Sequence, residues 1–273
     1  MYQEILYDVA DPVATIRLDR PKALNAWTNR MGAEVKHALS QAEADRRVVA
    51  IVLTGEGRGF CAGADLHALA RLSHGEGMGA VPPELTAEPG DPSVGEDFRG
   101  TYTFVMSLRK PVIAAINGPT AGMAVPIALA CDLRFASDRA TFTTAFSRRG
   151  LVAEWGVAWL LGRLTGPAHA LDILFSGRGF DAAEAERIGL VNRVLPHDEL
   201  LPFVRAYAED LAAHCSPISM AIMKRQVYQQ LQRSLGPSER EAVQLMLESF
   251  TRPDFREGVA SFLEKRPPRF ERL

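Results

Sequence analysis

The sequence predicts an α/β protein in which a mixed first part is followed by an α-helical region, and three observations carry this prediction. Two β-rich runs flank a helical pattern near the N-terminus. An apolar run with a glycine turn, at 110–136, indicates a strand followed by a buried helix. From Asp198 onward helical patterns dominate, with breaks at Pro217, Pro237 and Pro253.

The first unit reads as strand, helix, strand. Val13–Leu18 and Val48–Leu53 are β-rich, and between them one helical face carries apolar residues, namely Met31, Val35, Ala38, Leu39 and Ala42. Such a unit favours parallel pairing through a right-handed crossover. Residues 21–25 form the turn before this helix.

The stretch from Lys110 to Ala136 reads KPVIAAINGPTAGMAVPIALACDLRFA. Its VIAAI run has the length of a strand buried on both faces. Residues 117–119 end this strand, and Gly122 allows a tight turn into a buried helix. The unpaired N–H groups at such a helix start favour negative charge and could stabilise an oxyanion. A buried helix without chemistry is the commoner meaning of this pattern.

The remaining elements are shorter. Strands are expected near 133–136, 141–143 and 191–195. Asp181 and Glu184 form a capping box, and Gly189 ends the helix that they begin. The Gly- and Pro-rich segment 74–99 has no core pattern, so we expect a mobile loop over a site, disorder or a solvated insertion.

Composition limits the possible partners and compartments. The 273 residues carry a net charge of −2, which provides no electrostatic reason to bind nucleic acid or an anionic membrane. Cys61, Cys131 and Cys215 lie far apart without metal-ligand spacing, so we expect reduced thiols, no metal site and a cytoplasmic protein. The N-terminus does not resemble a signal peptide, and the apolar run 112–130 is interrupted by Asn117, two prolines and two glycines.

A second glycine turn follows the strand at 48–53 and reads GEGRGFCAGADL at 55–66. It lacks both the GxxxxGK[ST] and the GxGxxG spacing, which excludes the usual nucleotide-binding loops. Two glycine turns, each between a strand and a helix, could each contribute one N–H group to a single oxygen, as an oxyanion hole requires.

Four motifs together resemble the enoyl-CoA hydratase/isomerase (crotonase) superfamily: FCAGADL at 60–66, KPVIAAINGPTAGM at 110–123, CDLRFAS at 131–137 and SGRGFDAAEAERIGLVNRVLP at 176–196. The resemblance implies a crotonase-like spiral of ββα units over 1–196 and a helical trimerisation region over 197–273. It also implies a homotrimer or a hexamer.

The same resemblance implies specific site residues. The backbone N–H groups of Ala64 and Met123 would form the oxyanion hole for an acyl-CoA thioester, which is the substrate, so that no further cofactor is needed. The residues implied in coenzyme A binding are Lys22, Ala23, Leu24, Ala62, Asp65 and Leu66, with Phe262 and Lys265 acting at a neighbouring subunit's site.

The chain departs from the family pattern at the residues that transfer protons. Hydratases of the family use two glutamates, and the corresponding positions here hold Pro126 and Phe146. Met123 replaces a usual glycine, and His67 stands where a lysine often contacts the coenzyme. Glu154 occupies the position of the catalytic acid in family isomerases.

Glu154 is also the only carboxylate between Asp138 and Asp172, and apolar residues surround it in sequence. Apolar surroundings raise the pKa of a carboxyl group, which suits a base that must return its proton. Without the resemblance, a surface glutamate at a turn would be the preferred interpretation.

One carboxylate suffices to move a double bond from C3–C4 to C2–C3, so the sequence favours enoyl-CoA isomerisation. Hydration with a single acid is the next alternative. Other acyl-CoA reactions of this fold (hydrolysis, dehalogenation or C–C cleavage) and non-catalytic binding, including RNA binding, stay open. The charge of −2 argues against RNA.

Overall fold

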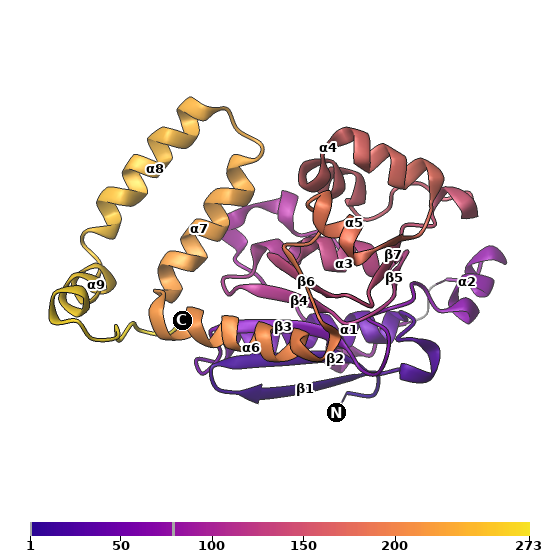
Figure 1. The fold of residues 1–273 in the computed structure, drawn as a ribbon, viewed down its shortest axis with the longest axis horizontal. Helices are drawn as coiled ribbons and strands as arrows, with labels where there is room; N and C mark the ends of the chain where they lie inside the picture. Colours follow the sequence, from indigo (N-terminus) through magenta and orange to yellow (C-terminus); the bar gives the residue numbers. More distant parts are fainter. Residues whose placement is uncertain (1, 78–79) are drawn as a thin grey trace.

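The computed structural model describes residues 2–77 and 80–273 and is built on a six-stranded sheet (Figure 1). The strands follow the order β1-β2-β3-β4-β6-β9 and comprise Ile5–Ala10, Val13–Leu18, Ala50–Gly55, Val112–Ile116, Leu133–Ser137 and Arg193–Leu195. β1 is antiparallel to β2, and each later pair is parallel. The parallel β2–α1–β3 unit expected from the sequence is confirmed.

Helices cover both faces of this sheet. On one face lies α1 (Asn29–Ala44), which begins where the Thr28 hydroxyl accepts from the N–H group of Met31, and the apolar residues expected on its inner face are buried. On the other face α6 (His197–His214) packs Leu200 and Val204 against the sheet. The first helix after residue 196 is therefore part of the layered core.

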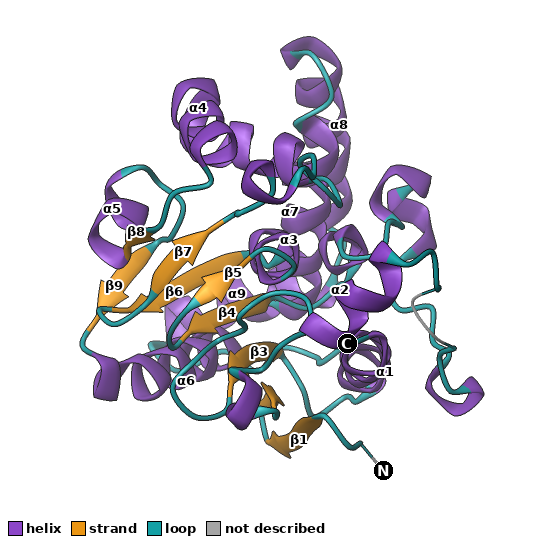
Figure 2. Ribbon diagram, turned by 90° about the vertical axis from the view of Figure 1, so that its right-hand side faces the viewer, coloured by secondary structure: helices purple, strands orange, loops and turns teal. Residues whose placement is uncertain are grey.

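A second, three-stranded sheet lies beside the first (Figure 2). It contains β5 (Thr120–Ala121), β7 (Thr141–Thr143) and β8 (Phe180–Asp181). The helices near it are α3 (Ala124–Ala130), α4 (Val157–Ser176) and α5 (Ala182–Arg187), whereas α2 (Leu66–Ser73) lies apart from it, after the glycine turn that follows β3. Asp181 caps α5 by accepting from the N–H group of Glu184, but the Glu184 carboxylate accepts from Arg178 and Arg187, so the described contacts contain only one arm of the expected capping box. Gly189 adopts a φ of 79° after the helix, as expected.

The last three helices stand to one side of the core (Figure 1). They are α7 (Pro217–Gln230), α8 (Leu235–Ser249) and α9 (Pro253–Glu264). α7 is tied to the core at Asp132, which accepts from Lys224 Nζ at 2.7 Å and from the Tyr228 hydroxyl at 2.8 Å. None of the helices in the described part of the chain is long and apolar enough to cross a membrane.

Three expectations from the sequence need correction. β1 was not expected, because its mixed polar and apolar residues are largely half-exposed at the sheet edge. β3 and β9 each begin two residues later than expected, at Ala50 and Arg193.

The third correction concerns the segment 74–99. It does contribute to the core, because short 3-10 turns bury Leu85, Val94 and Phe98. These are isolated anchors without periodicity, so no pattern revealed them. Residues 78 and 79 of this segment lie outside the described residues.

Candidate functional site

The candidate site lies where two adjacent parallel strands end. β3 and β4 run side by side, so the glycine turns that follow Gly55 and Ile116 meet at one edge of the sheet. Two buried amides hold the first turn. Asn117 Oδ1 accepts from the Gly55 N–H at 3.1 Å, and the Asn25 amide donates to the Gly59 carbonyl at 2.8 Å.

Backbone hydrogen bonds join the two turns directly. The Cys61 N–H donates to the Pro119 carbonyl at 3.1 Å, and the Ala121 N–H donates to the Cys61 carbonyl at 3.0 Å. Gly63 adopts a φ of 99°, and a Cβ atom there would lie 2.9 Å from the Ala121 carbonyl oxygen. Only glycine therefore permits this close approach.

Ala64 and Met123, the two expected donors, are placed on these neighbouring turns. Ala64 lies between two hydrogen bonds, because the Trp27 N–H donates to Gly63 at 2.7 Å and the Asp65 N–H donates to Trp27 at 2.9 Å. Within residues 2–77 and 80–273, no protein acceptor is found for the N–H group of Ala64 or of Met123. Two unpaired backbone donors therefore lie on turns that are bonded to each other.

Glu154 lies in a tight turn before α4. Trp155 and Gly156 adopt left-handed φ angles of 55° and 81°, and the Val157 N–H donates to the Glu154 carbonyl at 2.9 Å. The carboxyl group is half-buried. Burial raises its pKa, and a hydrogen bond from Trp155 offsets part of that rise. A raised pKa is a property that a proton-transferring carboxyl needs.

A row of aromatic rings connects this turn to the Ala64 turn. Trp155 packs edge-on against Tyr102 at a centroid distance of 5.6 Å, and Tyr102 packs edge-on against Trp27 at 5.7 Å. Trp27 in turn pairs with Ala64. Burial raises the pKa of Tyr102, a hydrogen bond with Trp27 offsets part of that rise, and the nearby Cys61 and Glu154 add to it. The sequence pattern did not reveal Tyr102, because no periodic or spaced motif includes it.

Several residues implied in coenzyme binding also meet at this edge. Lys22 and Ala23 are exposed on the short turn Pro21–Ala23, and the Leu24 carbonyl accepts from the Ala62 N–H at 2.9 Å. Leu66 is exposed at the start of α2. The turn at 22–24 therefore adjoins the glycine turn at 60–66.

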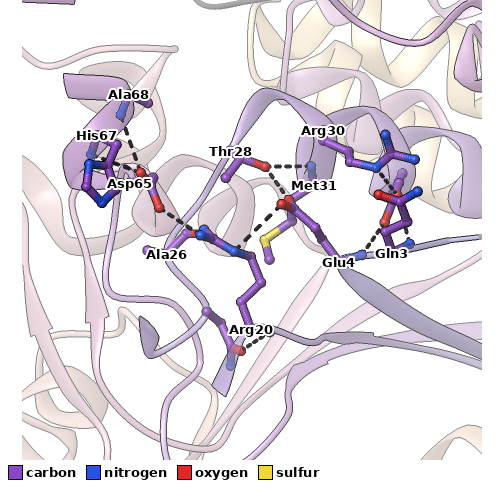
Figure 3. Close-up of polar contacts among 12 residues, drawn as sticks. Gln3, Glu4, Arg20, Ala26, Thr28, Arg30, Met31, Asp65, His67 and Ala68 are labelled. Atoms are coloured by element: carbon purple, nitrogen blue, oxygen red, sulfur yellow. Dashed lines mark hydrogen bonds and ion pairs between the residues drawn. The ribbon is translucent and has the colours of Figure 1, made fainter. Parts of the chain in front are cut away.

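The side chain of Asp65 is already engaged within the chain. One carboxylate oxygen accepts from the N–H groups of His67 and Ala68, which caps α2, and the other accepts from Arg20 at 2.8 Å (Figure 3). The His67 side chain is exposed on α2.

Phe262 and Lys265 are not brought to this site within one chain. Both belong to the α9 region, at the opposite end of the molecule from α2 (Figure 1). Phe262 is 83% exposed there. Pro126 and Phe146 are buried and contribute no carboxylate.

The chain is similar to known proteins over nearly its whole length. The family model described as enoyl-CoA hydratase/isomerase matches residues 8–272. A probable enoyl-CoA hydratase of Mycobacterium bovis is 34% identical over 269 residues, covering 98% of both chains. The 1,2-epoxyphenylacetyl-CoA isomerase of Escherichia coli is 33% identical over 273 residues, covering 99% of both.

Solved structures show the same fold over nearly the whole chain. An enoyl-CoA hydratase of Bacillus anthracis matches with a TM-score of 0.85 and 29% identity, covering 98% of this chain and 99% of that one. A Geobacillus kaustophilus structure of an enoyl-CoA hydratase subunit matches with a TM-score of 0.84 and 32% identity, covering 98% of both chains. The fold is therefore the crotonase fold, and the chain belongs to the enoyl-CoA hydratase/isomerase family.

Proposed function

We propose that this protein is an acyl-CoA enzyme that moves the double bond of a 3-enoyl-CoA to the 2-position. The N–H groups of Ala64 and Met123 bind the thioester oxygen and stabilise the enolate, and each such donor contributes roughly 3–4 kcal/mol. Glu154 removes a proton from C2 and returns it at C4.

The observation that carries this proposal is the position of Glu154. It is a half-buried carboxyl with a raised pKa, and a row of aromatic rings links its turn to the turn of the unpaired Ala64 N–H. A group in these surroundings can accept a proton and release it again within one catalytic cycle.

Isomerisation is favoured over hydration because one carboxylate is enough for it. Hydration requires activating water and protonating carbon, which two carboxylates share in related hydratases, and Pro126 and Phe146 can do neither. The Escherichia coli relative that is 33% identical is also named an isomerase of an acyl-CoA. The relatives named enoyl-CoA hydratases support hydration of a 2-enoyl-CoA as the second candidate.

We further place the substrate's coenzyme A along Lys22, Ala23, Leu24, Ala62 and Leu66, at the exposed rim of the donor turns. Phe262 and Lys265 would reach it from a second copy of the chain in a trimer or hexamer. The protein would work in the cytoplasm without a further cofactor, nucleic acid or membrane.

The test compares turnover of 3-enoyl-CoA and 2-enoyl-CoA thioesters by the wild type, Glu154→Gln and a matched control, Glu209→Gln. Glu209 has a side chain that is 45% exposed, and among the described residues it pairs only with Arg205. Glu154→Gln should lower turnover of the 3-enoyl-CoA by roughly 10²–10⁴-fold and leave acyl-CoA affinity nearly unchanged. Glu209→Gln should match the wild type.

The outcomes separate the alternatives. Equal rates for the wild type and Glu154→Gln would show that Glu154 is only a turn residue. Formation of a 3-hydroxyacyl-CoA from the 2-enoyl substrate, identified by NMR, would favour hydration. Tight acyl-CoA binding without turnover of either thioester would indicate a binding protein.

A further inference from the structure

Arg20 is the centre of a cluster of charged side chains that includes Asp65, the residue after Ala64 (Figure 3). It follows β2, and its guanidinium donates to the Ala26 carbonyl and, at 2.8 Å, to Asp65 Oδ2. Its Nε atom lies 3.7 Å from Glu4 Oε1. The guanidinium thus contacts oxygen atoms of three separate segments of the chain, at Ala26 and Asp65 through hydrogen bonds to acceptors and at Glu4 through an ion pair.

Two of these acceptors flank the backbone bridge that holds Ala64. Ala26 directly precedes Trp27, and Asp65 directly follows Ala64, while Trp27 and Ala64 form the bridge itself. By holding Ala26 and Asp65 at once, Arg20 fixes the spacing of the two segments that this bridge joins. The direction of the unpaired Ala64 N–H depends on that spacing, because this N–H lies in the same planar peptide group as the Gly63 carbonyl, which accepts from the Trp27 N–H at 2.7 Å.

The cluster is braced so that Arg20 has little freedom to move. The N–H group of Glu4 donates to Glu34 Oε2 at 2.8 Å, and Glu34 is fully buried. The other Glu4 oxygen accepts from the Thr28 hydroxyl. Burial raises the pKa of Asp65, but the hydrogen bonds from Arg20, Ala68 and His67 outweigh this effect and leave the pKa lowered, so the carboxylate stays charged.

We propose that Arg20 is a positioning residue for the proposed reaction, because its guanidinium aligns the Ala64 N–H with the thioester oxygen by holding Ala26 and Asp65 together. This inference rests on the proposed role of Ala64. Lysine cannot replace arginine here, since an ammonium group lacks the planar fork that contacts both acceptors.

The first measurement is the infrared carbonyl stretch of bound butanoyl-CoA labelled with ¹³C at the thioester carbon. Hydrogen bonds to the carbonyl oxygen polarise the C=O bond and lower its stretching frequency. The wild type should lower the frequency relative to free butanoyl-CoA. Arg20→Met should lose part of this shift. Arg20→Lys should show a shift between those of the wild type and Arg20→Met.

The matched control is Arg178→Met. Arg178 also forms a forked ion pair, with Asp172 at 2.7 Å and Glu184 at 2.6 Å, and its side chain is 33% exposed, compared with 26% for Arg20. It belongs to the turn before α5 and contacts none of the candidate site residues in the described contacts. Arg178→Met should keep the full carbonyl shift, even if it loses comparable thermal stability.

The second measurement is turnover of a 3-enoyl-CoA by the same variants. Removing an oxyanion donor outright lowers kcat by about 10²–10³-fold, so a misaligned donor should lower it by about 10–100-fold. KM should change less, because the bond to the oxygen strengthens as charge develops in the transition state.

The outcomes distinguish this inference from the proposed function. A wild type that binds butanoyl-CoA without a carbonyl shift would overturn the donor role of Ala64 and, with it, the role of Arg20. A wild-type shift that Arg20→Met and Arg20→Lys keep in full would overturn the positioning role alone. If Arg20→Met does not fold, Arg20→Lys decides: a reduced shift with a lowered kcat supports the role, and wild-type values overturn it.

Discussion

At the scale of single residues, the proposed reaction depends on a carboxyl group whose surroundings raise its pKa. Glu154 is half-buried beside Trp155, and its pKa is raised by burial. The raised pKa predicts that activity rises with pH and that the contribution of Glu154 to stability falls with pH.

Activity should rise with pH through the raised pKa of Glu154. The proposed reaction starts with the ionised carboxylate, and a raised pKa moves ionisation above the usual range of a glutamate. The measurement is kcat/KM for a 3-enoyl-CoA from about pH 4 to pH 8. An acidic limb at the pKa of a free glutamate would contradict this expectation.

Stability should respond in the opposite direction. A carboxyl group whose folded-state pKa is raised contributes stability below its unfolded pKa, and this contribution is lost as the pH rises through the folded value. Glu154→Gln should therefore match the wild type in acid and gain thermal stability relative to it near neutral pH. Tm values of both proteins across this range would check this, and a constant difference would contradict it.

Sequence reasoning named the candidate site residues that belong to local motifs. Ala64, Met123 and the turn at 22–24 lie within short glycine- or proline-marked segments, and the structure places these segments side by side. Arg20 and Tyr102 were not found. Their partners Asp65 and Trp155 lie many positions away in the chain, so only the folded structure brings each pair together.

At the scale of elements, buried strands and the amphipathic helix were predictable because their patterns are strong. β2 and β4 have the expected bounds, and α1 buries its expected face. The edge strand β1 and the turns within 74–99 were missed. An edge strand buries few of its residues, and isolated anchors such as Phe98 have no period to detect.

The tie between α7 and the core supports an element-scale prediction. Lys224 is nearly buried and also donates to the carbonyls of Val105 and Lys110, at 3.0 and 3.1 Å. Lys224→Met should cost roughly 1–3 kcal/mol, because Asp132 and two carbonyls lose a donor. It should also speed hydrogen exchange in α7.

The control for this prediction is Lys36→Met, since Lys36 pairs with Glu88, whose side chain is 80% exposed. That change should cost less than about 1 kcal/mol. Equal unfolding free energies for the two variants would show that the Asp132 tie does not anchor α7.

The segment 74–99 carries a second prediction at this scale. Amide exchange should be slow around the buried anchors Val94 and Phe98 and faster around His74, which is exposed. Adding butanoyl-CoA should slow exchange in the faster part. Slow exchange throughout, unchanged by the thioester, would contradict a loop that responds to the substrate.

At the scale of the whole molecule, the last three helices expose much apolar surface. The exposed large apolar residues there are Met223, Val227, Leu231, Leu235, Val243, Met246, Leu247, Phe250, Phe255, Val259, Phe262 and Leu263. A surface of this kind marks an interaction site. We expect a trimer or a hexamer, in which a second copy covers these helices.

Light scattering at micromolar concentration checks this expectation, and a monomer would contradict it. Within such an assembly Phe262→Ala should weaken acyl-CoA binding, because α9, on which Phe262 is 83% exposed, lies at the opposite end of the molecule from α2 and would face the coenzyme site of a second copy. Phe255→Ala, also on α9, provides the comparison. Similar acyl-CoA affinities for both variants and the wild type would show that Phe262 does not contribute to coenzyme binding.

The hydrogen bonds that join the two glycine turns have a consequence for how this protein could acquire new chemistry. The N–H groups of Ala64 and Met123 belong to the main chain, so among substitutions at these two positions only proline would delete a donor. The backbone could therefore keep both N–H groups while the side chains around them are substituted. Under the proposed mechanism, a carboxylate gained at 126 or 146, or lost at 154, would redirect the reaction without rebuilding the fold.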